Sequence, residues 1–138
     1  MKVVSNASVL ISLSSIGRLS LLQDRFPDGV AAPQAVWREV VLEGGTRPGA
    51  QEVARASWIQ IQEIIASGTM MPLLLAELDE GEAESIALAI EIKADVILLD
   101  ERDARRVARS MGLQVLGTVG ILDDSGSDPP CWIRSLGA

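Results

Sequence analysis

Short apolar runs alternate along the chain with segments whose apolar residues recur every three or four positions. The runs at Val3-Val4 and at residues 30–32, 95–99 and 114–116 predict buried strands, and residues 58–61 predict a further strand-like segment. The repeating segments predict helices that carry Val9, Leu10, Leu13 and Ile16; Leu19, Leu22 and Phe26; Val36, Trp37, Val40 and Val41; Ile86, Leu88, Ala89 and Ile92; and residues 101–111. Strands that alternate with helices indicate a parallel sheet flanked by helices, so we expect a three-layer, Rossmann-like α/β fold.

Capping and turn residues place the ends of these elements. Asn6 is suited to cap the first helix, and Asp79 with Glu82 has the spacing of a capping box. Residues 44–49 are rich in glycine and predict a loop. Periodicity stops after Leu122, so we expect one domain over residues 1–122 and an irregular tail over 123–138.

Length and composition favour one compact domain. The chain has 138 residues, of which 48% are hydrophobic, and this is enough to fill a single core. Its single cysteine, Cys131, excludes an internal disulfide and a Cys₂ metal site. The first residues lack the apolar stretch of a secretory signal, and no apolar run has transmembrane length, so we expect a cytoplasmic protein without a membrane partner.

The charge balance argues against general attraction for nucleic acid. The formal net charge is −7, so any binding to RNA or DNA requires a local basic patch. Four arginines, Arg102, Arg105, Arg106 and Arg109, share one predicted helix. They could contact phosphate, pair with Glu101 and Asp103, or complement the helix dipole, and we take solvated or ion-paired side chains as the ordinary interpretation.

Polar residues at strand ends are the candidates for chemistry. Asn6 follows Val3-Val4, and Asp100 follows four apolar residues, 96–99. In open α/β sheets, ligands bind beyond the carboxyl ends of the strands, and Glu39, Glu82 and Asp103 could complete an acidic cluster there. Because the chain has no histidine, such a cluster indicates Mg²⁺ or Mn²⁺, which prefer oxygen ligands.

Four segments, in this order, resemble the successive motifs of PIN-domain nucleases. They are Val-Val-Ser-Asn-Ala-Ser-Val-Leu-Ile-Ser-Leu near the start, Pro-Gln-Ala-Val-Trp-Arg-Glu-Val-Val, Gly-Glu-Ala-Glu-Ser-Ile-Ala-Leu-Ala, and Val-Ile-Leu-Leu-Asp-Glu-Arg-Asp-Ala-Arg-Arg-Val-Ala. The resemblance covers residues 2 to about 122. Within the family, the sequence is most similar to a prokaryotic branch related to the VapC-type ribonuclease toxins.

This resemblance implies metal-dependent cleavage of RNA and an antitoxin protein as a partner. The family's acidic positions correspond here to Asn6, Glu39, Glu82 and Asp100, with Asp103 as an additional acid. Glu84 is a possible substitute for Glu82. The main departure from the family pattern is Asn6, because an amide replaces the first carboxylate.

Each of these positions also has a structural interpretation. Asn6 and Asp100 are suited to cap the helices that follow them, Glu82 completes a capping box, and Glu39 lies at the edge of an apolar helix face. The first rival to a nuclease is therefore a catalytically inactive PIN-like protein-binding module. A second rival is a receiver-like signalling domain, because residues 94–100 also resemble a phosphoacceptor strand.

An association surface is a further expectation. The apolar pieces between Leu19 and Leu22, together with the irregular tail, predict an exposed patch that a second copy covers. We therefore expect a homodimer.

Overall fold

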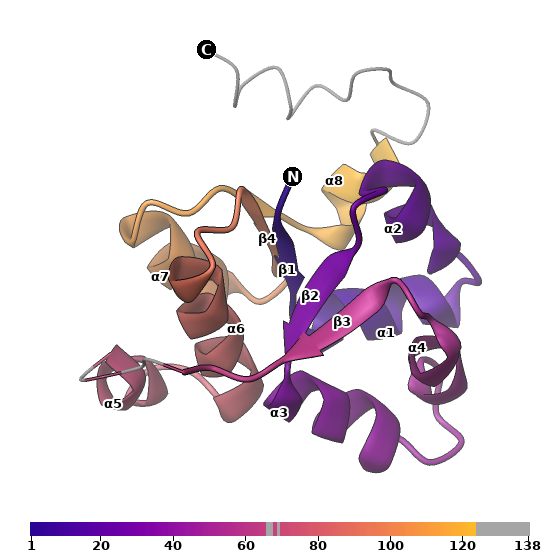
Figure 1. Ribbon diagram of the computed structural model, residues 1–138, viewed down its shortest axis with the longest axis horizontal. Coiled ribbons are helices and arrows are strands. Elements are labelled where there is room, and N and C mark those ends of the chain that lie inside the picture. Colours follow the sequence, from indigo (N-terminus) through magenta and orange to yellow (C-terminus); the bar gives the residue numbers. More distant parts are fainter. Residues whose placement is uncertain (66–67, 69, 124–138) are drawn as a thin grey trace.

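A five-stranded parallel sheet forms the centre of the molecule in the computed structural model, which describes residues 1–65, 68 and 70–123 (Figure 1). The strand order is β3-β2-β1-β4-β5, and every neighbouring pair runs parallel. The strands are β1 (Val3–Ser5), β2 (Val30–Pro33), β3 (Ile59–Gln62), β4 (Val96–Leu98) and β5 (Val115–Leu116). The expected parallel α/β fold is confirmed.

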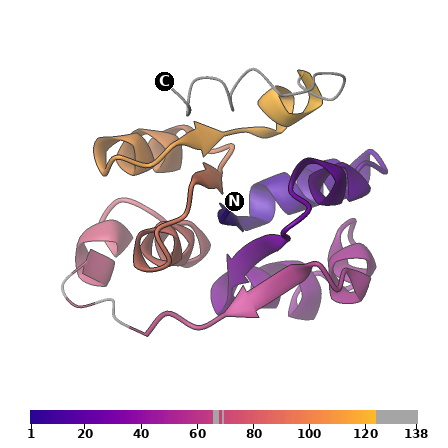
Figure 2. The same ribbon diagram turned by 45° about the horizontal axis from the view of Figure 1, so that its top comes forward.

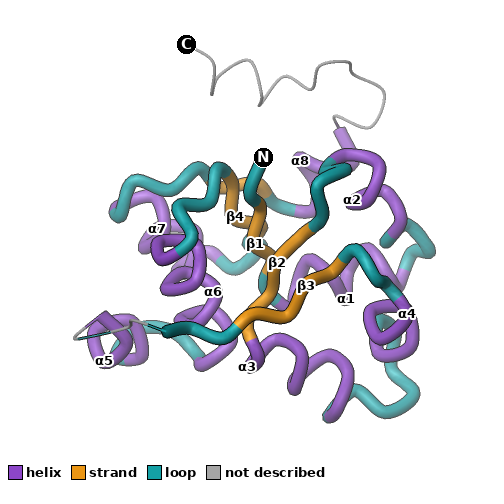
Figure 3. Tube along the Cα trace, in the orientation of Figure 1, coloured by secondary structure: helices purple, strands orange, loops and turns teal. Residues whose placement is uncertain are grey.

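Helices cover both faces of this sheet, as Figure 3 shows by colour. The helices are α1 (Ala7–Ser15), α2 (Ser20–Arg25), α3 (Gln34–Trp37), the π-helix η1 (Arg38–Leu42), α4 (Ala50–Arg55), α5 (Met70–Leu75), α6 (Glu80–Glu91), α7 (Arg102–Ser110) and α8 (Thr118–Asp123). The strand order differs from the 2-1-3-4-5 order of receiver domains. The receiver alternative is therefore wrong.

Two apolar clusters, one on each face, hold the layers together. Successive strand residues point to opposite faces, so Val3 packs with α1 in one cluster while Val4 packs with α6 in the other. The first cluster takes residues from α1, α2, α3, η1, α4 and α8, and the second from α5, α6 and α7. Figure 2 shows these two groups of helices on either side of the strands.

Three short helices were missed in the sequence. Each of α4, α5 and α8 has six residues, fewer than two turns, which is too short for an apolar repeat to be visible. The helix expected after Pro33 also changes character, since only Gln34–Trp37 is α-helical and Arg38–Leu42 is a π-helix. In that turn the Glu43 amide donates to the Arg38 carbonyl, five residues back, at 2.8 Å.

The expected exposed patch between Leu19 and Leu22 is not found. Leu22 is fully buried and Leu19 is 8% exposed, because both side chains belong to the core of the first face. This segment therefore gives no support to a homodimer. Asp123 is the last residue of α8, and the rest of the expected tail lies outside the described residues.

None of the helices in the described part of the chain combines the length and the apolar character needed to cross a membrane.

The π-helix generates a test of the fold, because it depends on Gly44. A Cβ atom at this position would lie 2.0 Å from the Val40 carbonyl oxygen. We expect Gly44→Ala to lower the free energy of unfolding by about 3 kcal/mol, since backbone would have to move. Gly45→Ala is the control: Gly45 has a φ of 57° and open space around it, so only left-handed strain of about 1–2 kcal/mol is expected. Urea unfolding of both variants measures the difference, and equal losses would contradict the steric argument.

Candidate active site

The strand order places a crevice between β1 and β4. From β1 the chain proceeds to β2 and β3 on one side, whereas β4 and β5 lie on the other. Ligands of open α/β sheets bind at such a switch point, beyond the carboxyl ends of the strands. In Figure 1 these ends lie on the side of the molecule where α3 begins. Asn6 follows β1 at this edge, and residues 99–101 follow β4.

Asn6 acts as the N-cap of α1. Its Oδ1 accepts a hydrogen bond from the Val9 amide at 3.3 Å, and its own backbone amide donates to the Leu98 carbonyl at 3.1 Å. The residue is 2% exposed. The structural role expected for Asn6 is therefore present, and it uses the oxygen that a metal ion would need.

Glu39 lies in η1 and faces the start of α6. Its Oε1 is 3.5 Å from the position that a Cβ would take at Gly81, so the missing side chain gives this carboxylate room. Partial burial, followed by the charges of Asp79 and Glu43, raises the pKa of Glu39 above its ordinary value. The carboxylate is thus held where a negative charge is disfavoured.

Glu82 belongs to the capping box at the start of α6. The Glu82 amide donates to Asp79 Oδ1 at 2.8 Å, and the Asp79 amide donates to Glu82 Oε1 at 3.3 Å. Burial raises the pKa of Glu82, the hydrogen bond from the Asp79 backbone opposes this, and the charges of Asp79, Glu101 and Glu39 raise it further. Glu82 therefore has the capping role that its spacing predicted and also senses the other acids of this edge.

Glu101 and Asp79 are acids of this edge that the sequence analysis did not include in the site. Glu101 is the N-cap residue of α7, and its Oε1 accepts a hydrogen bond from the Ser8 hydroxyl of α1 at 3.4 Å. This contact crosses the crevice between the segments that follow β1 and β4. Strand β4 ends at Leu98, earlier than expected, which leaves three residues before α7. Only the geometry of that connection shows that the charge of Glu101, rather than that of Asp100, raises the pKa of Glu82.

The Asp100 side chain points toward the segment that follows β5, the outermost strand on this side of the sheet. Its Oδ1 accepts from the Thr118 amide and its Oδ2 from the Thr118 hydroxyl, both at 2.7 Å. These bonds tie the carboxylate to the first residue of α8. Asp100 was expected to cap the helix that follows it, and this is wrong, because Glu101 is the N-cap residue of α7 and Asp100 accepts from the first residue of α8 instead. Its role as a metal ligand remains a prediction.

Asp103 and Glu84 are not among the charges that raise the pKa values of Glu39 and Glu82. The Asp103 side chain is 72% exposed and lies 3.9 Å from Arg106 Nη2. Glu84 Oε1 accepts from the Ala35 amide at 3.2 Å, which caps the start of α3. The role of each as a metal ligand remains a prediction.

The structure thus brings Glu39, Asp79, Glu82 and Glu101 into one electrostatic neighbourhood. Within residues 1–65, 68 and 70–123, no three acidic or cysteine side chains are arranged closely enough to enclose a metal ion. The site is an open edge with carboxylates contributed by separate helices, and bound phosphate would have to supply further oxygen ligands.

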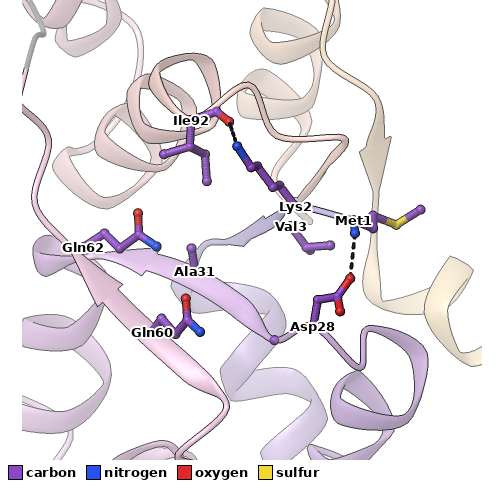
Figure 4. A pocket seen from close by; sticks show the side chains of 9 residues that line it. Met1, Lys2, Val3, Asp28, Ala31, Gln60, Gln62 and Ile92 are labelled. Atoms are coloured by element: carbon purple, nitrogen blue, oxygen red, sulfur yellow. Dashed lines mark hydrogen bonds and ion pairs between the residues drawn. The ribbon is translucent and has the colours of Figure 1, made fainter.

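A groove of about 410 Å³ lies at the opposite edge, near the amino ends of β1 and β2 (Figure 4). Gln60 and Gln62 of β3 line it together with Ala31. Its cations are already engaged, because Lys2 Nζ donates to the Ile92 carbonyl at 3.2 Å and the Met1 amine pairs with Asp28 at 2.7 Å. This groove is separate from the acidic edge, and we assign it no role in the chemistry.

Because the pKa of Glu39 is raised, we predict that Glu39→Gln increases the free energy of unfolding by an amount that depends on pH. The Glu39 carboxyl group binds its proton more tightly in the folded protein than in the unfolded chain. The free energy of unfolding therefore falls as the pH rises from the pKa of Glu39 in the unfolded chain to its pKa in the folded protein. We expect the variant to be more stable than the parent near pH ~7 and to lose this gain near pH ~4, where the unfolded glutamate also becomes protonated. Urea unfolding at both pH values, without divalent metal, measures the effect. Asp24→Asn, at an exposed acid of α2, is the control, and an equal response of both variants would refute the local origin of the shift.

Comparison with known proteins agrees with the motifs and with the fold. A sequence model of a family described as a PIN domain matches residues 2–127, which is most of the chain. No curated protein matches the sequence. Because the match spans all five strands and every described helix of the sheet's two faces, the chain belongs to the PIN-domain family.

Proposed function

We propose that this protein is a metal-dependent ribonuclease whose Mg²⁺ or Mn²⁺ ion is held by Glu39 and Glu82. The observation that carries the proposal is the placement of both glutamates at the carboxyl edge of a PIN-family sheet, each with a raised pKa. Acids that repel one another at a ligand-binding edge are typical of a site built for a cation. Glu101 and Asp79 add negative charge around this pair.

The donor set suits a hard cation. The acids provide only oxygen atoms, and the chain has no histidine. Mg²⁺ binds through one or two carboxylates together with substrate phosphate and water, which agrees with an open site of two glutamates. When bound, such an ion lowers the pKa of a coordinated water and neutralises charge on a phosphate oxygen. The role left to the protein is to hold the two carboxylates, through the π-helix for Glu39 and through the capping box for Glu82.

The more specific biology belongs to the same proposal. The resemblance to VapC-type toxins supports single-stranded or structured RNA as substrate and an antitoxin protein as partner. For a homodimer, support moves from the buried Leu19 segment to α5, where Leu73 is 72% and Leu75 is 47% exposed. These two exposed leucines on one helix support α5 as the contact surface of such a dimer.

A second candidate function, a PIN-like module that binds protein without catalysis, rests on Asn6. The family's first carboxylate is replaced by an amide, and that amide is buried and committed to capping α1. If this position must contribute a charge, the domain retains its fold and loses its activity.

Removing either proposed ligand should weaken metal binding and slow cleavage. We expect Glu39→Gln and Glu82→Gln to weaken Mn²⁺ binding at least ~10-fold and to slow cleavage at least ~100-fold, because each removes one of two anionic ligands. Calorimetric titration with Mn²⁺ and a cleavage assay on mixed single-stranded RNA measure these effects. Asp24→Asn serves as the control for loss of one negative charge. Variants that bind Mn²⁺ and cleave as the parent does would exclude this site.

The substitution Asn6→Asp separates the two candidate functions. Asp and Asn are near-equivalent N-caps, so the helix should keep its stability. An added carboxylate beside the acidic edge should strengthen Mn²⁺ binding and raise the rate of RNA cleavage. Asp100→Asn is the companion variant: if Asp100 is a ligand, cleavage is lost, whereas loss of stability alone indicates its role at Thr118. An Asn6→Asp protein with unchanged metal binding and no cleavage would favour the binding module.

A further inference from the structure

The four arginines of α7 fall into two groups. Arg106 is paired, since its Nη2 lies 3.7 Å from Glu77 and 3.9 Å from Asp103. Arg102 and Arg109 are exposed and make no ion pair or side-chain hydrogen bond with any residue in the described part of the chain. The sequence favoured solvated or ion-paired side chains over phosphate contact for all four. Among these four arginines, the structure shows ion pairing with a described residue for Arg106 alone.

The remaining arginines lie on one face of the helix. Ala104, Val107 and Ala108 face the core, and Arg102, Arg105 and Arg109 follow one another at intervals of three and four residues. Arg105 is half-buried, and its Nη1 is 3.5 Å from the position that a Cβ would take at Gly117, so this face borders β5. Figure 2 shows α7 on the flank of the molecule with β5 beside it. We call Arg102, Arg105 and Arg109 the arginine face.

This arrangement is unfavourable for the helix itself. Arg102 is the first residue of α7, where the helix dipole favours anions rather than cations. Arg102 with Arg106 and Arg105 with Arg109 are like charges four residues apart, a spacing that destabilises a helix. Only Arg109, in the last turn, is favourably placed with respect to the dipole. The fold therefore does not explain why the charge of Arg102 is present, whereas Arg105 lies four residues after Glu101, a favourable spacing for opposite charges.

We propose that the arginine face binds the phosphodiester backbone of a single-stranded RNA and directs it along α7 to the acidic edge. Arg102 directly follows Glu101, which lies in that edge, and Arg109 is seven residues further along the helix. This is about 10 Å along the axis, the length of roughly three nucleotides at the rise of a stacked strand. One guanidinium group can donate two parallel hydrogen bonds to two oxygens of the same phosphate, which the ammonium group of lysine cannot do in this geometry. Arginine therefore fits this ligand better than lysine would.

The net charge of the protein makes this local surface necessary. With a formal charge of −7, and with carboxylates clustered at the reactive edge, the field of the molecule repels a polyanion. A substrate strand can approach only where cations are free and accessible, and Arg102 and Arg109 of the arginine face are such cations next to the site. The inference rests on the proposed ribonuclease function and identifies where its substrate is held.

The test measures binding rather than cleavage, so that it does not depend on catalysis. Fluorescence anisotropy with a short labelled uridine oligoribonucleotide, in EDTA, compares the parent with Arg102→Gln/Arg109→Gln. The control is Arg55→Gln/Arg106→Gln, which removes the same charge from α4 and from the paired arginine of α7. If both contacts are lost, the slope of log K against log salt should fall by about 1.4, and binding at ~0.1 M salt should weaken about 25-fold. Cooperative thermal unfolding well above the assay temperature shows that both variants are folded.

The outcomes are distinct. Weaker binding and a smaller salt slope only in the arginine-face variant support the proposal, even if no RNA is cleaved and the nuclease function fails. Equal effects in both variants, or none in either, overturn it, even if the parent is an active nuclease. A polyglutamate peptide that displaces the RNA at lower charge concentration than competing RNA would also overturn it, since the face would then fit an acidic protein segment instead.

Discussion

The parallel pairing of β1 with β4 is the constraint on which the rest of the structure depends. Val3 and Val96 are in register although they lie far apart in the sequence, and the pairing continues beyond the strand through the Asn6 amide, which donates to the Leu98 carbonyl. Both strands are central and buried, so a slip of one residue would turn their side chains to the wrong faces. Once the register is fixed, α1 and α7 begin at the same edge, and the contact of Ser8 with Glu101 follows. The position of the candidate site is therefore a consequence of strand pairing.

Helix starts and acidic side chains are combined at this edge in a way that serves both stability and chemistry. Asn6 caps α1, Glu84 caps α3 and Asp79 with Glu82 caps α6, so the orphan amides of three helices are satisfied by groups of the kind that bind cations. The Asp79 amide attracts the negative charge of Glu82, yet the pKa of Glu82 is raised because burial and neighbouring acids outweigh that attraction, and burial and neighbouring acids also raise the pKa of Glu39. A cation would relieve this repulsion. Capping and ligation are therefore compatible for Glu82, which offers two oxygens, and compete at Asn6, which has only one.

The sequence allowed the sheet and its order of elements to be predicted, because apolar strands and helical repeats are properties of a few consecutive residues. Glu39 and Glu82 were also identifiable, from motif order and from capping spacing. Two features were not accessible. The π-helix depends on the approach of Gly44 to the Val40 carbonyl, which no spacing encodes. That Glu101 is a neighbouring charge of Glu82 depends on where β4 ends, and element boundaries are set by tertiary hydrogen bonds such as those of Thr118 rather than by periodicity.

The amino-acid composition does not show which arginines of this acidic protein are in ion pairs and which are not. An acidic protein with ten arginines could neutralise most of them in surface ion pairs, and Arg38 with Glu80 and Arg106 with Glu77 show this ordinary use. On α7 Arg106 is paired, whereas Arg102, which directly follows Glu101 of the acidic edge, and Arg109 are not paired with any residue that the structure describes. Repulsion among these arginines and with the helix dipole lowers the stability of α7, whereas a bound phosphate chain would reverse the sign of both effects. A helix that is destabilised alone and stabilised by its ligand couples binding to local order, so α7 is the element whose stability should respond most to an RNA strand.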